Sequence, residues 1–336
     1  MGRVPALLAV IALCLCAVAQ AAITIDTVAV GDVGNAPDTR YATPGFGSVG
    51  YTYKIGTYET TAGQYTAFLN AVAATDTYGL YNSQMWDSSE GCKIQRGGSS
   101  GGYGYSVASD WANRPVNFVS YWDSCRFANW LHNGQPIGFQ DASTTERGAY
   151  NLDGYTGLDG RNIGRNTGWK WAIPSEDEYY KSAYYKSNGA DAGYWDYPMQ
   201  SDVATVPSND LTNPDGGNNA NCYMNHYTLG GPYWRTNVGE FENSESAYGT
   251  FDQSGNVSEW NEAIPFFTKT TASRGVRGGS YRSFLPYIRA ESRGWLYPSL
   301  EQMDLGFRVA AVPEPSSLVV LAGGLMPLFA LRRRRQ

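Results

Sequence analysis

Histidine is nearly absent from this sequence, which narrows the metal chemistry that the chain can support. Only His132 and His226 occur among 336 residues, and neither has a second histidine or a carboxylate nearby at the spacing of metal ligands. A metal centre built on three histidines is therefore excluded. We interpret both side chains as structural or surface groups.

Cysteine is scarce as well. After the first 21 residues only Cys92, Cys125 and Cys222 remain, which permit at most one disulfide with one thiol left over. No two of them form a C-x-x-C pair, so a disulfide scaffold and a zinc module of that type are both excluded. Cys125 lies on the apolar face of a predicted helix, where we expect an inert buried thiol rather than a nucleophile.

Basic residues are outnumbered by acidic ones. The chain has 25 Lys and Arg against 31 Asp and Glu; without Arg3, the four C-terminal arginines and Glu314, 20 basic and 30 acidic residues remain, a net charge of about −10. Such a surface disfavours nucleic acid and anionic lipid as partners. Glycine and tyrosine are abundant instead, with 39 and 25 residues, which is typical of a loop-rich fold packed through aromatic rings.

The N-terminal segment has the composition of a cleavable export signal. Arg3 precedes an apolar run from Ala6 to Ala19 that is short for a membrane span, and the run ends in the small-x-small pattern Ala-Gln-Ala that signal peptidase reads. We therefore assign residues 1–21 to a signal peptide. A lipoprotein signal is the weaker alternative, because a leucine precedes both Cys14 and Cys16.

The C-terminal segment combines three features. Val312-Pro-Glu-Pro315 is followed by an apolar stretch from Leu318 to Leu331 and by the arginine cluster Arg332–Arg335. Together they resemble the PEP-CTERM sorting signals of Gram-negative bacteria, so we interpret residues 312–336 as a sorting tail. The resemblance implies transient insertion of 318–331 into the inner membrane, with the arginines in the cytoplasm. It also implies cleavage near Pro-Glu-Pro by an exosortase-type enzyme, and an ordinary tail anchor is the alternative.

Residues 22–311 are predicted to form a single domain, large enough to bury a core without disulfides. Apolar residues recur at helical spacing at three places, two of which carry an N-cap signal and one a C-cap glycine, Gly134; the long stretches between them are rich in glycine and turn signals. The predicted helices follow a cap at Thr60 or Thr61, span about Tyr121–Leu131, and begin after Ser175 with Glu178 completing a capping box. We therefore expect an irregular, loop-rich α+β fold with short helices and small antiparallel sheets. Tyr65 and Phe68 of the first helix are expected in the core.

Seven short phrases stand in a recognisable order along this domain. They are Tyr53-Lys-Ile-Gly-Thr-Tyr-Glu-Thr-Thr61, Asn113-Arg-Pro-Val-Asn117, Phe127-Ala-Asn-Trp-Leu131, Ile173-Pro-Ser-Glu-Asp-Glu-Tyr-Tyr180, Phe251-Asp-Gln-Ser-Gly-Asn-Val-Ser-Glu-Trp260, Arg277-Gly-Gly-Ser-Tyr281 and Gly306-Phe-Arg-Val-Ala310. In this order they resemble the formylglycine-generating enzyme, or sulfatase-modifying factor, family, over about residues 27–311. The resemblance implies a variant of the C-type lectin fold and leaves the function open, because one fold hosts many functions.

The resemblance also points to a missing copper site. Active members of the family oxidise a sulfatase cysteine to formylglycine with copper held by two cysteines just after the Arg-Gly-Gly-Ser-aromatic phrase. Here no cysteine follows Tyr281, and Ser283 stands where the first would be. An alcohol cannot replace the thiolate that Cu(I) selects. We therefore assign no catalytic residue and do not expect copper. The related iron-dependent sulfoxide synthases need three histidines, which this chain lacks.

A calcium site is implied by the same resemblance. In the family a side-chain oxygen, two backbone carbonyls and a glutamate hold Ca²⁺, and the matching positions are Asp252, Gly255, Val257 and Glu259. Oxygen ligands of this kind are the ones that Ca²⁺ prefers. The alternative is that Asp252 and Glu259 merely cap a turn on an acidic surface.

A second calcium site is implied only in part. In the family it begins with an asparagine side chain and the carbonyl of the next residue, which match Asn221 and Cys222. Its aspartate is replaced in this sequence around Gly230–Pro232, so this second site stays open.

Three functions follow from these observations. The first is a non-catalytic, calcium-stabilised module that binds a glycan or a protein of the cell envelope or extracellular matrix. The second is an enzyme of the formylglycine-generating or non-heme-metal type that acts on an unknown substrate. The third is a modifier that binds exported sulfatases without oxidising them. The missing copper thiolates and the sorting tail favour the first, with an inner-membrane-tethered precursor that ends at the surface or outside the cell.

Overall fold

The computed structural model describes residues 22–189 and 191–312, so the predicted signal peptide and nearly all of the predicted sorting tail lie outside the described residues. The helices are α1 (Ala62–Val72), α2 (Gln84–Asp87), α3 (Ser109–Ala112), α4 (Tyr121–His132) and α5 (Glu176–Tyr184), with a 3₁₀ turn η1 (Leu285–Ile288). The strands are β1 (Thr27–Val30), β2 (Tyr53–Gly56), β3 (Ile94–Gly97), β4 (Gly104–Val107), β5 (Trp171–Ala172), β6 (Ser258–Asn261), β7 (Arg274–Arg277), β8 (Gly294–Leu296), β9 (Leu305–Gly306) and β10 (Ala310–Ala311). In this part of the chain no helix is both long and apolar enough to cross a membrane.

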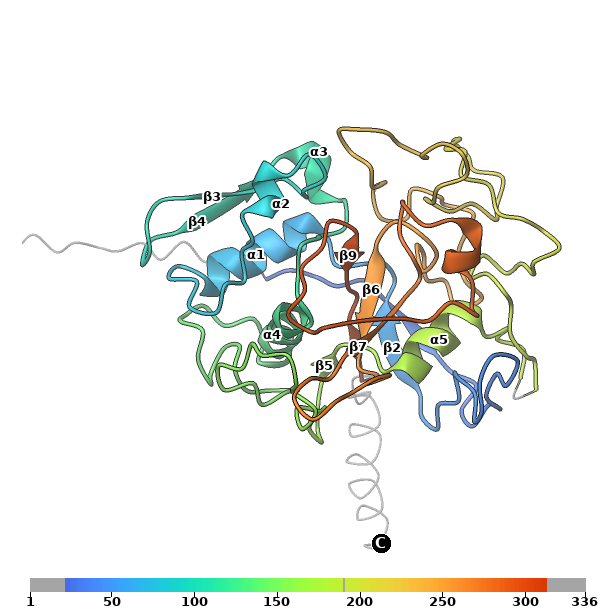
Figure 1. The fold of residues 1–336 in the computed structure, drawn as a ribbon, viewed down its shortest axis with the longest axis horizontal. Coiled ribbons are helices and arrows are strands. Elements are labelled where there is room, and N and C mark those ends of the chain that lie inside the picture. Colours follow the sequence, from blue (N-terminus) through green and yellow to red (C-terminus); the bar gives the residue numbers. More distant parts are fainter. Residues whose placement is uncertain (1–21, 190, 313–336) are drawn as a thin grey trace, which may run out of the picture.

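The expected α+β class, with short helices and small sheets joined by long loops, is confirmed. Figure 1 shows β6 and β7 in the middle of the molecule, with α1, α4 and the β3–β4 hairpin on one side and α5 with the long loops that follow it on the other. One sheet has the order β1-β2-β10-β5 and another β8-β7-β6-β9. Neighbouring strands are antiparallel except β6 and β9, which pair in parallel. Because β10 lies beside β2, the two ends of the domain meet in one sheet.

The three predicted helices are present as α1, α4 and α5, and two of them begin at the capping residues that the sequence indicated. Thr61 and Ser175 accept hydrogen bonds from the backbone of the third helical residue and complete capping boxes with Gln64 and Glu178. These side chains satisfy amide groups that a helix leaves without partners in its first turn. The short helices α2 and α3 were not predicted, because four residues are too few for an apolar period to show.

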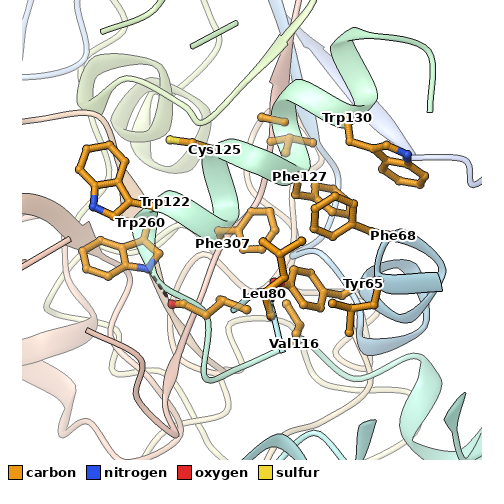
Figure 2. Packing of buried hydrophobic residues seen from close by; sticks show 14 of the residues in the cluster. Tyr65, Phe68, Leu80, Val116, Trp122, Cys125, Phe127, Trp130, Trp260 and Phe307 are labelled. Carbon is orange, nitrogen blue, oxygen red and sulfur yellow. Dashed lines mark hydrogen bonds between the residues drawn. The ribbon is translucent and has the colours of Figure 1, made fainter. Parts of the chain in front are cut away.

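Aromatic rings form the main core, as expected for α1. Tyr65 and Phe68 are fully buried. Phe127 of α4 packs edge-on against Phe68 and against Phe307, with ring centroids 5.3 Å apart in both pairs (Figure 2). Trp260 of β6 extends the core and donates a hydrogen bond of 3.1 Å to the Val119 carbonyl. The core therefore joins α1 and α4 to β6 and fixes the strand that carries the predicted calcium phrase.

Candidate metal site and the Ser283 pocket

The predicted calcium phrase is a tight turn that leads into β6. Asp252 and Gly255 both have positive φ, at 61° and 88°. A Cβ on Gly255 would lie 2.2 Å from the carbonyl oxygen of Asn221, so only glycine fits there. The next residue, Asn256, donates from its backbone N–H to that same carbonyl at 2.8 Å. The turn thus lies directly against Asn221, and the structure brings the residues of both predicted sites together.

Glu259 is held in a buried ion pair. Arg308 donates to both of its carboxylate oxygens, at 2.7 and 2.8 Å, and neither side chain is exposed. Tyr179 adds a hydroxyl donor at 3.2 Å. A two-point pair of this kind is strong and geometrically specific. A cation at Glu259 would therefore share the carboxylate with Arg308.

Asp252 is less constrained. Its Oδ2 accepts a hydrogen bond of 2.6 Å from the backbone N–H of Gly239. Burial raises the pKa of Asp252 to about 6, and the nearby charges of Glu259 and Glu240 act in the same direction. Keeping Asp252 ionised in this buried position therefore costs free energy, and a bound cation would offset that cost.

Glu59 is an acidic neighbour that the sequence did not point to. It is 1 % exposed, and its Oε1 has no hydrogen-bond partner among the described residues. Asn256 donates to its other oxygen at 3.4 Å. Burial and the negative charges of Asp252 and Glu259 raise the pKa of Glu59 well above its usual range. The only sequence signal was its place in the Tyr-Glu-Thr-Thr phrase.

These observations test whether the residues fit calcium. Glu59, Asp252 and Glu259 are three acidic side chains that influence one another's pKa, and Arg308 forms an ion pair with Glu259 alone among them. Within the described ranges no three His, Cys, Asp or Glu side chains lie together as a metal cluster. An ion here would therefore need backbone carbonyls as well, as predicted for Gly255 and Val257. The donor set suits a hard cation with oxygen ligands.

The second predicted calcium site offers one side-chain oxygen without a hydrogen-bond partner among the described residues and no carboxylate from the loop that follows it. Asn221 is 1 % exposed, and its Oδ1 has no partner in the described part of the chain. Its amide nitrogen donates to the Trp234 carbonyl and to Asn256 Oδ1, both at 3.1 Å. The Cys222 carbonyl accepts from Asn209 at 3.1 Å. No Asp or Glu occurs in residues 222–239, so a cation beside Asn221 would have no carboxylate from that loop.

Ser283 lines a pocket of about 180 Å³ beside β6 and β7. Its Oγ accepts a hydrogen bond of 2.9 Å from the Ser280 backbone N–H. The three described cysteines are free and buried. Cys222 packs against Ile288 and Leu285 of the loop that follows Ser283, and burial raises the pKa of its thiol to about 12. A protonated thiol in an apolar cluster is a poor copper ligand.

Comparison with known proteins decides the family. A model of the sulfatase-modifying factor enzyme 1-like domain matches residues 30–312. The chain belongs to this family. CarF is similar in structure, with a TM-score of 0.50 and 20% identity over 87% of this chain and 99% of its own. A comparison with curated protein sequences gave no match.

Two further solved structures are more distant. Variable protein 1 of Treponema denticola has a TM-score of 0.47 and 17% identity, and it covers 86% of this chain and 95% of its own. PvdO from Pseudomonas aeruginosa has a TM-score of 0.44 and 18% identity, with 86% and 92% covered. The match to CarF supports the family fold and says nothing of the reaction.

Proposed function

We propose that this family member is an exported, non-catalytic binding module, stabilised by calcium, of the cell envelope or extracellular matrix. The observation that carries the proposal is Ser283. Its hydroxyl stands at the first copper-cysteine position that the family resemblance implies, and it is engaged with the Ser280 backbone. A serine hydroxyl stays protonated at neutral pH and offers Cu(I) no soft ligand.

Calcium at the Asp252–Glu259 turn is supported by charge and by ligand chemistry. Glu59, Asp252 and Glu259 are all acids with raised pKa values in a buried setting, next to one arginine. A divalent cation would relieve this repulsion, and the turn adds the carbonyls of Gly255 and Val257.

Export and sorting are supported by the two ends of the sequence. A signal peptide at 1–21 directs export, and the Pro-Glu-Pro tail at 312–336 directs transient membrane insertion through 318–331 and processing by an exosortase-type enzyme. The excess of acidic residues leaves a glycan or an envelope protein, rather than nucleic acid, as the ligand.

Two measurements test this function. Metal analysis of the purified protein should find calcium and neither copper nor iron. Incubation with a sulfatase peptide, with or without added copper, should give no formylglycine by mass spectrometry. The Ser283→Cys variant should also be inactive, because the second thiolate is still missing. Bound copper or iron, or formylglycine made by the unmodified protein, would instead favour the family's enzymatic function.

A further inference from the structure

A chain of aromatic side chains leads away from the Ser283 pocket: Tyr287 lines the pocket, Phe284 follows Ser283 in sequence, and the half-buried Tyr223 and Tyr227 continue the chain. Phe284 and Tyr287 are 54% and 61% exposed, which is high for large apolar side chains. Tyr223 packs edge-on against Phe284 at 5.1 Å, and Tyr227 packs against Tyr223 at 4.9 Å. These four residues, here called the aromatic rim, come from two loops that a hydrogen bond from Tyr223 N–H to the Ser283 carbonyl, at 2.9 Å, holds together. Large apolar groups gathered at the surface are typical of a binding site.

The pocket beside the aromatic rim is lined by hydroxyl groups. Ser258, Ser283 and Ser292 all contribute to its wall. Within the described part of the chain, the hydroxyls of Ser258 and Ser292 have no hydrogen-bond partner. Ser283 accepts from the Ser280 backbone, and its Oγ also lies 3.5 Å from the Ser280 hydroxyl, a long contact in which either oxygen can donate. The pocket therefore offers several donors and acceptors to a ligand.

Rim and pocket are held rigidly. A Cβ on Gly279 would lie 2.8 Å from the Tyr287 carbonyl oxygen and 3.1 Å from the Ser283 side chain, so η1 packs directly on this glycine. Arg277 donates to the carbonyls of Ala290 and Ser292 and fixes the opposite wall, while its guanidinium pairs with Glu176. A site that is formed before binding loses less entropy when the ligand arrives.

Three arginines around the site are paired with acidic side chains. Arg282 lies 3.5 Å from Glu90, and Arg289 lies 3.0 Å from Glu291. Arg293 pairs with Glu176 at 2.6 Å. Asp304 accepts a hydrogen bond of 3.1 Å from the Ser280 hydroxyl and is in no ion pair with another described residue, so one carboxylate lies near the site and disfavours an anionic ligand. The three arginines are neutralised by their partners, and the remaining chemistry of the face consists of aromatic rings and hydroxyls.

We propose that the aromatic rim and the hydroxyl-lined pocket bind a neutral saccharide. The C–H face of a pyranose ring is apolar and packs on aromatic rings, while the hydroxyls around its edge need hydrogen-bond partners. The aromatic rim supplies the apolar surface for the ring face, and the serines of the pocket supply the hydrogen-bond partners for the sugar hydroxyls. This proposal rests on the binding function proposed above and names the ligand class and the surface.

The test is titration calorimetry of the purified protein with three neutral tetrasaccharides, cellotetraose, chitotetraose and maltotetraose. At least one should bind, and Phe284→Ala and Tyr287→Ala should each weaken it at least tenfold. Both residues are more than half exposed, so the variants should fold normally. Phe139→Ala is the matched control, because Phe139 is 70% exposed and lies outside the rim and pocket.

Failure of this proposal can be told from failure of the proposed function. Binding to none of the three sugars, or equal binding by the rim variants, overturns the saccharide site. Self-association that the rim variants abolish, seen by sedimentation without sugar binding, would make this face a protein contact and would also overturn it. If the protein binds sugar but contains no calcium, the proposed saccharide site stands and the proposed stabilisation by calcium is wrong.

Discussion

At the scale of single residues, Asp252 carries the most direct test of the calcium site. Its negative charge is repelled by those of Glu59 and Glu259, and a bound cation would relieve this repulsion. Calcium should stabilise the native state by about 2.7 kcal/mol when the free ion is near a hundred times its dissociation constant. Asp252→Ala should remove most of that increment, measured as the change in unfolding temperature when a chelator is added.

Glu242 provides the control for this experiment. It is acidic, exposed and outside the turn, so Glu242→Ala should respond to calcium as the wild type does. If the chelator leaves the unfolding temperature of the wild type unchanged, or if Asp252→Ala still responds fully, the two carboxylates are ordinary turn residues.

Glu301 makes a residue-scale prediction about pH. Burial and the charge of Asp123 raise its pKa from 4.5 to about 8. Between these two pKa values the folded state binds a proton that the unfolded state has lost, so the contribution of Glu301 to stability is fully present below pH 4.5 and is lost as the pH rises through about 8. Urea midpoints at pH 5.5 and 8 should differ, and Glu301→Gln should reduce the difference. An equal pH dependence in this variant would rule out Glu301 as its source.

At the scale of elements, the turn before β6 depends on a single glycine. Gly255→Ala should destabilise the protein by about 2 kcal/mol or more, because alanine disfavours the positive φ and its Cβ would collide with the Asn221 carbonyl. Gly50→Ala is the matched control, since nothing lies within 4 Å of the added Cβ. Urea unfolding measures both. If both variants lose a similarly small amount of unfolding free energy, the turn can accommodate a side chain at position 255 and the prediction is wrong.

At the scale of the whole molecule, the domain closes on itself through β10 and β2, and the predicted sorting tail follows directly after Ala311 of β10. We expect the mature protein to lack Arg332–Arg335, because a Pro-Glu-Pro motif before a short apolar stretch is a cleavage signal. Mass spectrometry of the envelope fraction decides this. An intact arginine cluster in the mature pool would mean a permanent tail anchor.

Local signals in the sequence were sufficient for the longer helices and for the family. Thr61 and Ser175 mark helix starts through bonds to residues three positions away, which composition and spacing reveal. The absence of cysteine after Tyr281 is likewise visible without a structure. The phrase containing Asp252 and Glu259 identified the candidate calcium turn, and whether it binds calcium stays a prediction.

What only the tertiary structure decided depends on contacts between distant residues. Glu259 pairs with Arg308, 49 positions away, and Glu59 meets Asn256 across 197 positions. The hydroxyl-lined pocket arises only when β6, β7 and η1 come together. No periodic pattern encodes such pairs, because chain closure and core packing, rather than local propensity, set which loops meet. The sequence therefore determined which residues the protein has and lacks, and the fold determined which of them act on one another.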